Sequence, residues 1–353
     1  MSLGVTVVVC TYNGAALLPE TIKHIAQQRV HSGISWEVII VDNASTDNTS
    51  NVILEEWKKH QNPAPFRLLH QPRQGLTYAR ELALTNSHYA FVLFCDDDNW
   101  LDPDYVNLSY DLMLQNPSVG VLGGYGELVY EVSPPSWATA LPLFANGPQA
   151  KESGKVRRNA VYGAGCVLRK SAYKVIYKAG FKPMLTDRVG SNLSSGGDYE
   201  LCYAIALAGY DIWYDERLKF KHFMPDGRIS WNYYVRYFKE AAQCFEVLLP
   251  YQLLLNHGSK NTVSFSLKLF MMLLLYILKK LPVLFASVTT SSGTEEAKLN
   301  TLKFMGFKGR LLSFTRYRAM KRNFKAILKF KQEKLSVASK LNSAQANTYA
   351  MAG

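Results

Sequence analysis

The sequence predicts an α/β protein with a mostly parallel central sheet flanked by helices. Through the first 116 residues, short apolar and β-branched runs alternate with segments of helical periodicity. This alternation is typical of parallel strands joined by crossover helices, and the unbroken apolar runs indicate strands covered on both faces. Strands are expected at 5–10, 36–43, 66–71 and 89–98, and helices at 15–28, 49–60, 76–86 and 103–116.

From about residue 118 to 235 the alternation is less regular. The run VGVLGGYGELVY (119–130) is strand-like, and an irregular Pro-rich loop follows it. GGDYELCYAIALAG (196–209) predicts a helix whose first turn contains Asp198 and Glu200. Acidic side chains in a first turn interact favourably with the helix dipole, so capping is one interpretation of both residues.

The composition is that of a globular protein with a sizeable core. The chain has 353 residues, of which 48% are hydrophobic and 19% charged, enough for one large domain or for one domain with an appendage. The five cysteines are scattered without a CxxC pair, so neither a zinc site nor a disulfide framework is expected, and a reducing compartment fits best. The N-terminal run VTVVVC reads as a core strand, and no signal peptide is expected.

The C-terminal third has a different character. Residues 266–288 contain ten consecutive apolar residues, 269–278, bounded by lysines. A membrane-spanning helix requires about 20, so this segment predicts an interfacial or re-entrant helix.

The positive charge lies just beyond that segment. Residues 303–334 hold eleven Lys or Arg and one acid, which is +10 of the net +12. Aromatic and aliphatic residues interleave with the basic ones, a pattern that predicts a membrane-surface helix. A solvated basic helix and a nucleic-acid arm remain alternatives. Nucleic acid is not expected as a partner, because the predicted sheet domain has almost no net charge.

Polar clusters follow several predicted strands directly, where ligands of open α/β sheets bind. The clearest is CDDDN (95–99), which places Asp96, Asp97 and Asp98 side by side. Adjacent carboxylates repel one another unless they face water or a cation. Mg²⁺ or Mn²⁺ takes one or two carboxylates together with water or phosphate oxygens, and such an ion also neutralises a diphosphate leaving group. An ordinary acidic loop is the alternative.

Five clusters in this order and spacing resemble the family 2 glycosyltransferases, which have the GT-A fold. The clusters are CTYNG (10–14), VDNASTDN (41–48), GLTYARELAL (75–84), CDDDNWLDPDYV (95–106) and GGDYELCYAIALAGYDIWYDERLKFKH (196–222). The resemblance covers residues 5 to about 225. It implies transfer of a sugar from a nucleotide-diphosphate donor to an acceptor hydroxyl with inversion, usually with Mg²⁺ or Mn²⁺ as cofactor.

The resemblance also implies donor-binding residues. Thr11, Tyr12 and Asn13 match the motif that lines the nucleotide pocket, and Asp42 matches a carboxylate that contacts the base or ribose. Arg80 matches an arginine that faces the diphosphate or pairs with an acid.

Asp96 and Asp98 match the D-x-D pair of the family, with Asp97 in the variable middle position. By this match Asp98 is a direct metal ligand, and Asp96 holds ribose or metal. His222 matches a late histidine that completes the metal or phosphate site, although a lone histidine can equally be structural.

Asp198 matches the catalytic base that removes the acceptor proton. The family pattern G-E-D-x-[DE]-L here reads Gly-Gly-Asp-Tyr-Glu-Leu over 196–201, so its first acid is missing. Asp198 is therefore the expected base, and Glu200 is expected to support it in the substrate site. The stretch GAGCVLR (163–169) resembles the glycine-rich loop that approaches donor and acceptor.

The leading hypothesis is a metal-dependent inverting glycosyltransferase that uses a UDP-sugar and a saccharide or lipid-linked acceptor in cell-surface polysaccharide synthesis. Residues 1–235 would form the catalytic domain, 236–335 a helical membrane-associating extension, and 336–353 a disordered tail. The protein would then lie in the cytoplasm, on the inner face of the cell membrane. A sugar nucleotidyltransferase and a non-catalytic membrane adaptor are the alternatives. Against the former, CTYNGAALLP has one glycine and no basic residue to bind phosphate.

Overall fold

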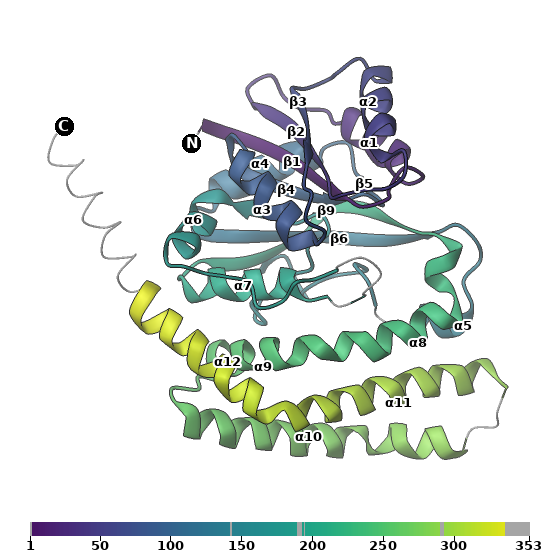
Figure 1. Ribbon diagram of the computed structural model, residues 1–353, viewed down its shortest axis with the longest axis vertical. Coiled ribbons are helices and arrows are strands. Elements are labelled where there is room, and N and C mark those ends of the chain that lie inside the picture. The colour runs from purple at the N-terminus through teal and green to yellow at the C-terminus, as the bar shows by residue number, and fades with distance from the viewer. Residues whose placement is uncertain (1, 142, 189–192, 194, 290–292, 336–353) are drawn as a thin grey trace, which may run out of the picture.

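The computed structural model describes residues 2–141, 143–188, 193, 195–289 and 293–335. A twisted sheet with helices on its faces forms one part of the molecule, and a layer of long helices lies beneath it (Figure 1). The strands are β1 (Ser2–Thr11), β2 (Trp36–Asp42), β3 (Phe66–His70), β4 (Tyr89–Asp96), β5 (Asn99–Leu101), β6 (Val119–Tyr130), β7 (Gly154–Lys155), β8 (Val167–Arg169) and β9 (Asp211–Met224).

Helices are found within each of the ranges expected at 15–28, 49–60, 76–86, 103–116 and 196–209. Those of the sheet domain are α1 (Leu18–Ala26), α2 (Thr49–Lys59), α3 (Leu76–Asn86), α4 (Tyr105–Gln115), α5 (Ser136–Thr139), α6 (Lys170–Lys178) and α7 (Gly197–Leu207). After a short 3₁₀ turn η1 (Asp226–Ile229) come α8 (Trp231–Glu240), η2 (Ala241–Cys244), α9 (Phe245–Leu255), α10 (Thr262–Thr289), α11 (Glu295–Ser313), η3 (Phe314–Arg316), α12 (Tyr317–Lys329) and a π-helical segment η4 (Phe330–Leu335).

The sheet is parallel in its first half and mixed beyond that. Its order is β3-β2-β1-β4-β8-β6-β9-β5, with β7 paired to β9. The strands β3, β2, β1 and β4 are mutually parallel, whereas β8 is antiparallel to both β4 and β6, and β5 and β7 are antiparallel to β9. The predicted α/β fold with flanking helices is confirmed: β6 and β9 also pair in parallel along most of their length, and the antiparallel pairings are short.

Alternation along β1 divides the core into two halves. Val7 and Val9 pack with α1, α2 and α4 on one face, while Val8 packs with α3, α6 and α7 on the other. This pattern fixes the register, because a shift of one residue would turn every buried side chain to the wrong face. The register aligns Cys10 with Asp96, and so brings the predicted polar clusters to one edge of the sheet.

The C-terminal helices continue the core instead of forming a separate body. Buried residues of α9, α10 and α12 belong to the same cluster as those of α6 and α7. Phe265 of α10 and Phe324 of α12 are both fully buried and stack with ring centroids 4.4 Å apart. The expected boundary at residue 236 falls inside α8, and the tail expected at 336–353 lies outside the described residues.

Helix α10 has one packed and one exposed apolar face. The exposed face contains eight large apolar side chains with exposed fractions from 40% to 77%: Val263, Leu267, Phe270, Met271, Leu274, Leu275, Leu278 and Leu281. Within the described residues one segment, Thr262–Pro282, is long and apolar enough to cross a membrane, and about a tenth of its most apolar stretch is buried. The packed face joins α10 to the rest of the helical layer, and the interfacial helix remains a prediction.

We predict that Phe265→Ala lowers the free energy of unfolding by about 3 kcal/mol or more, because it leaves a cavity in the core beside Phe324. Phe270→Ala, in the same helix but 62% exposed, should change it by less than about 0.5 kcal/mol. Urea unfolding followed by circular dichroism measures both. Equal effects of the two substitutions would show that α10 does not pack as described.

Candidate active site

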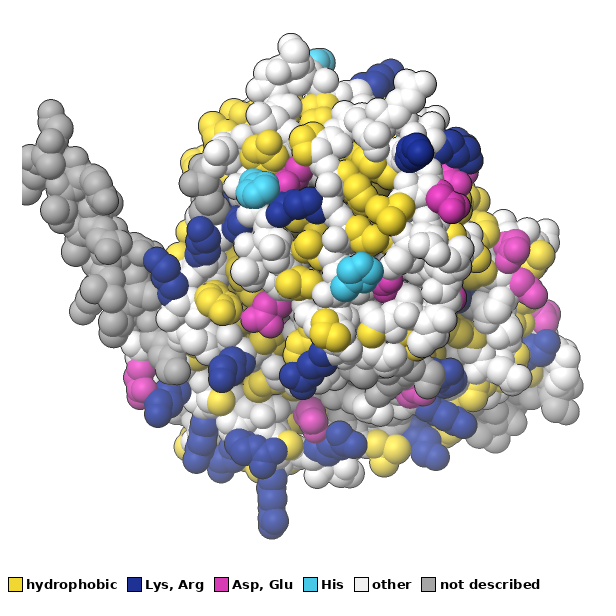
Figure 2. Space-filling model, turned by 45° about the horizontal axis from the view of Figure 1, so that its top comes forward, with side chains coloured by type: hydrophobic (Ala, Val, Ile, Leu, Met, Phe, Trp, Pro, Cys, Tyr) yellow, Lys and Arg dark blue, Asp and Glu magenta, His cyan; other side chains and the backbone are white. Residues whose placement is uncertain are grey.

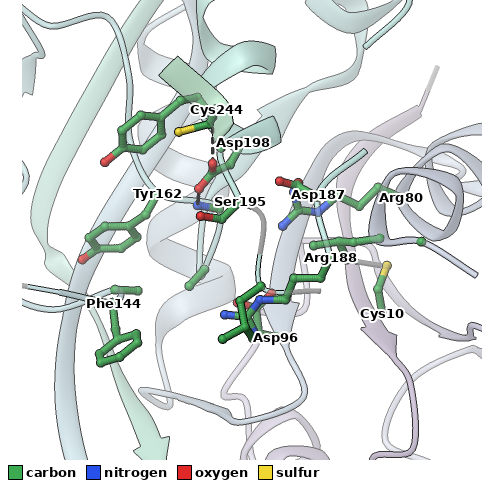
Figure 3. A pocket seen from close by; sticks show the side chains of 18 of the residues that line it. Cys10, Arg80, Asp96, Phe144, Tyr162, Asp187, Arg188, Ser195, Asp198 and Cys244 are labelled. Carbon is green, nitrogen blue, oxygen red and sulfur yellow. Dashed lines mark hydrogen bonds and ion pairs between the residues drawn. The ribbon is translucent and has the colours of Figure 1, made fainter. Parts of the chain in front are cut away.

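The carboxyl ends of β1 and β4 open into a cavity of about 730 Å³. The turn after β4, the start of α3, the loop at 162–164, the start of α7 and the end of β9 complete its walls. Thr11, Tyr12, Arg80, Asp198 and His222 line this cavity together with the acidic run. Figure 3 shows Asp198 and Tyr162 on one side, with Arg80, Asp187 and Asp96 farther across.

Asp98 is the most enclosed carboxylate of the acidic run, at 3% exposure. Its Oδ1 accepts a hydrogen bond from Asn99 Nδ2 at 3.0 Å. Its Oδ2 forms an ion pair with Arg228 Nη1 and lies 3.5 Å from His222 Nε2. Burial alone would raise the pKa of Asp98, but the charges of His222 and Arg228 hold it well below its usual range. Asp98 is therefore a buried anion whose fixed cationic partner is Arg228.

The pKa of Asp97 shifts in the direction opposite to that of Asp98. Thr11 Oγ1 donates to its Oδ2 at 2.7 Å, and Thr21 Oγ1 donates to its backbone carbonyl at 2.8 Å. Burial and the neighbouring charge of Asp98 raise the pKa of Asp97 to about 7. The repulsion expected between the adjacent carboxylates is thus reduced by proton retention on one and by ion pairing on the other.

The side chains around Asp98 provide part of the ligand set that a divalent cation needs. Among the described residues, no group of three or more His, Cys, Asp and Glu side chains forms a complete protein site. Mg²⁺ and Mn²⁺ need few protein ligands where phosphate oxygens supply the rest. The Asp98 carboxylate and the His222 imidazole converge, and His222 Nδ1 is buried without a hydrogen-bond partner among the described residues. These two side chains could hold such an ion with a bound diphosphate.

Asp198 lies in the first turn of α7 on the other side of the cavity. Its Oδ2 accepts a hydrogen bond from the Gly163 backbone N–H at 2.7 Å, and its Oδ1 accepts one from the Tyr199 N–H at 2.8 Å. Burial and the charge of Asp187 raise the pKa of Asp198 to about 6. A Cβ at position 163 would lie 2.7 Å from Arg80 Nη2 and 3.1 Å from Asp198 Cβ, so a larger residue there would displace the Arg80 guanidinium.

Arg80 joins the two sides of the cavity. Its Nη1 lies 3.6 Å from Asp187 Oδ2, and Asp187 Oδ1 accepts the Gly197 N–H at 2.7 Å. Burial would lower the pKa of Arg80, but Asp187, Asp96 and Asp198 raise it above its usual range. Arg80 therefore pairs with an acid and remains a fixed positive charge within the cavity wall.

Asn13 and Asp42 are not among the residues that line the cavity. Asn13 Oδ1 accepts the Thr46 N–H at 2.7 Å. Asp42 Oδ1 accepts the Ser45 N–H at 2.9 Å, and its Oδ2 accepts from the Ser50 hydroxyl. Both side chains thus stabilise the loop after β2, as short polar side chains in turns commonly do.

Glu200 also lies away from the cavity. It is fully buried, and its carboxylate accepts backbone N–H groups of Met184 and Leu185, each at 2.9 Å. Burial raises its pKa to about 7. Glu200 is expected to contact substrate, but in the structure it ties the loop before α7 to that helix. Trp100, which follows the acidic run, stacks between His24 and Phe223 and packs within the sheet domain.

The sequence analysis missed two groups of cavity residues. Asp187, Arg188 and Arg228 lie in loops whose path no periodic pattern reveals, although Arg228 is six residues after the matched His222. Helix α8 and the helices that follow it also form one wall of the cavity, although residues from 236 on are expected to associate with the membrane. Their contributions are Tyr233, Arg236, Tyr237, Cys244, Phe245, Leu248 and Gln252.

Comparison with known proteins identifies the fold and the family of the sheet domain. Residues 6–176 match the family model Glycosyl transferase family 2. The chain contains a family 2 glycosyltransferase domain. Two relatives are from Bacillus subtilis (strain 168). The putative glycosyltransferase EpsH is 31% identical over 29% of this chain and 28% of its own length. The putative teichuronic acid biosynthesis glycosyltransferase TuaG is 25% identical over 46% of this chain and 61% of its own.

The family 2 domain is also similar to poly(ribitol-phosphate) β-N-acetylglucosaminyltransferase TarP of Staphylococcus aureus (strain N315), 28% identical over 49% of this chain and 50% of that relative. The chain thus spans less than two thirds of the length of each of these relatives.

Among solved structures, the mannosyltransferase PcManGT from Pyrobaculum calidifontis, in complex with GDP-Man and Mn²⁺, gives a TM-score of 0.55 at 19% identity, covering 97% of this chain and 87% of that one. S. aureus TarS 1–349 in complex with UDP-GlcNAc gives 0.51 at 15% identity, covering 90% and 92%. These likenesses establish the GT-A fold.

Proposed function

We propose that this protein is a metal-dependent, inverting glycosyltransferase that moves a sugar from a nucleotide-diphosphate donor to an acceptor hydroxyl. The observation that supports this is the pair of distinct acids in one cavity. Asp98 is a buried anion facing cationic groups at the ends of the sheet strands, and Asp198 is a carboxylate of raised pKa on the start of α7. A donor diphosphate and an acceptor hydroxyl require two such sites.

The proposed donor site is the end formed by β1 and the turn after β4. Tyr12, at 39% exposure, presents a ring that a nucleobase can stack on, and Thr11 holds Asp97 in place. Asp98 and His222 would hold Mn²⁺ or Mg²⁺. A bound ion of this kind neutralises charge on the diphosphate leaving group. Arg188 and Arg228 line the same cavity and supply further positive charge.

Asp198 is the proposed base. Inversion requires the acceptor hydroxyl to attack from the side opposite the leaving diphosphate while a carboxylate accepts its proton. A pKa of about 6 leaves Asp198 ionised at neutral pH and still basic enough to accept that proton. The N–H groups of Gly163 and Tyr199 hold the carboxylate in a fixed orientation.

The proposed setting is the assembly of a cell-surface polysaccharide. The relatives include one named for teichuronic acid biosynthesis and one named as a poly(ribitol-phosphate) N-acetylglucosaminyltransferase. A UDP-sugar is the proposed donor, and a saccharide or lipid-linked saccharide the proposed acceptor. The aromatic side chains of Phe144, Tyr162, Tyr233 and Tyr237 on the cavity wall are suited to stack against sugar rings.

We further propose that the enzyme binds the cytoplasmic surface of the membrane through its C-terminal helices. The exposed apolar face of α10 supplies side chains that can enter the headgroup region. Basic residues of 303–334 provide charge complementary to anionic lipids. Figure 2 shows Lys and Arg side chains gathered along the lower part of the molecule, where these helices lie.

The donor site is tested by calorimetric titration with UDP, GDP and dTDP, each with and without Mn²⁺. We expect tight binding of one nucleotide only when Mn²⁺ is present, and loss of that metal dependence in Asp98→Asn. Asp47→Asn, in a loop outside the cavity, is the matched control and should bind as the wild type does. Failure of all three nucleotides to bind would overturn the proposed function.

The base is tested by Asp198→Asn. We expect unchanged nucleotide affinity and a decrease in transfer of at least about 10², the usual size of a general-base contribution. In the wild type, transfer should increase as the pH rises through about 6, because the carboxylate must lose its proton before it can act as a base. Turnover near that of the wild type in the variant, or a rate independent of pH between 5 and 7, would place the base elsewhere.

Membrane binding is tested by replacing three exposed side chains of α10 together, in the variant Leu267→Ser, Leu275→Ser and Leu278→Ser. We expect the wild type to sediment with anionic phospholipid vesicles at moderate salt and the variant to remain in the supernatant. The control replaces Leu54 and Leu114, which are similarly exposed on the sheet domain, and should still sediment. Sedimentation of the α10 variant would contradict the assignment.

A further inference from the structure

Arg228 occupies the place beside Asp98 that a metal ion would also require. Its Nη1 pairs with Asp98 Oδ2, the same oxygen that His222 Nε2 approaches to 3.5 Å. The other carboxylate oxygen, Oδ1, already accepts a hydrogen bond from Asn99. A cation held by Asp98 and His222 would therefore meet the guanidinium at a shared oxygen.

Hydrogen bonds hold the backbone around Arg228 in place, whereas its side chain lines the cavity. Arg228 lies in η1, where its own N–H donates to the Pro225 carbonyl at 2.8 Å and the neighbouring Ile229 is 4% exposed. The Asp226 N–H donates to Glu131 at 2.9 Å, which ties the turn to the end of β6. The Arg228 side chain is 21% exposed and lines the cavity. It can change partners without displacing the turn.

A divalent cation held at Asp98 would lie close to the Arg228 guanidinium, and the two positive charges would repel each other in the enclosed cavity. A guanidinium that leaves a carboxylate keeps its charge, and the planar fork of its N–H groups matches phosphate oxygens equally well. A nucleotide diphosphate bound beside Asp98 would present such oxygens within the same cavity.

We propose that Arg228 is an exchangeable partner of Asp98: it neutralises this carboxylate in the empty site and moves to the donor diphosphate when metal and nucleotide bind. This inference rests on the proposed function and adds to it one residue, which has different partners before and after the donor binds. The metal alone competes with Arg228 for Asp98. Metal and nucleotide together do not, because the nucleotide provides Arg228 with a new partner. The two therefore bind in a mutually dependent way.

The experiment measures Mn²⁺ binding in the absence of nucleotide, by electron paramagnetic resonance of free Mn²⁺, for the full chain and for Arg228→Gln. If Arg228 pairs with Asp98 in nine of ten molecules, its removal should strengthen the affinity for Mn²⁺ alone by about tenfold. Nucleotide affinity in the presence of Mn²⁺ should fall in the same variant, because the diphosphate loses a partner. Unchanged or weaker Mn²⁺ binding by Arg228→Gln would overturn the exchange.

Two further variants separate charge from geometry and from nonspecific effects. Arg228→Lys keeps the positive charge and should bind Mn²⁺ alone as weakly as the wild type, while its nucleotide affinity falls with loss of the planar fork. Arg236→Gln removes another cavity arginine, one that pairs with Glu240 at 3.0 Å, and should leave Mn²⁺ binding unchanged. A gain in Mn²⁺ affinity in Arg236→Gln equal to that in Arg228→Gln would overturn the specific exchange. Thermal unfolding confirms that each variant is folded.

The wild-type titration distinguishes the two levels of inference. If the wild type binds no nucleotide with Mn²⁺, the proposed function and the exchange fail together. If it binds nucleotide and Mn²⁺ jointly but Arg228→Gln gains no affinity for Mn²⁺ alone, the exchange fails and the proposed function stands.

Discussion

The organisation of the site depends on balancing carboxylates that are withdrawn from bulk water into one cavity. These are Asp97, Asp98, Asp187 and Asp198. Burial favours the protonated form of each, so a carboxylate that is to remain ionised needs cationic partners close by. For the acid run, these partners come from the end of β9 and the turn after it. The hydrogen bond from the Phe223 N–H to the Asp98 carbonyl, at 2.8 Å, holds that strand against the run. In this way the second half of the sheet places His222 and Arg228 beside the acidic run.

The C-terminal helices belong to the same physical unit as the sheet domain. Helix α9 packs against α7, which bears Asp198, and both contribute to one apolar core. Gln252 of α9 donates a hydrogen bond to the Tyr203 hydroxyl of α7 at 2.9 Å. Helix α8 supplies aromatic and basic side chains to the cavity, whereas none of the described residues of α10 lines it. The helical layer thus connects the proposed base, on α7, with the exposed apolar face of α10.

The fold of the sheet domain could be predicted because its signals are local. Apolar strands of even spacing determine the register, and the register alone brings Thr11 and the acidic run to one edge. Glu200 could have been placed correctly as well. Residues two positions apart on a helix point about 200° from each other, so Glu200 must face away from the side that Asp198 faces. Asp187 and Arg228 could not be predicted, because irregular loops set their positions and the ion pairs they form join segments distant in sequence.

Arg228 also stabilises the folded chain when no metal ion is bound at Asp98. An ionised Asp98 with no partner would cost the folded state several kcal/mol, so a chain dependent on the metal alone would be destabilised whenever the metal was absent. A guanidinium supplied by the chain itself removes that dependence, and its high pKa keeps it charged throughout. Because α8 begins directly after this turn, the side chain that responds to the donor is adjacent in the chain to the wall formed by Tyr233 and Arg236.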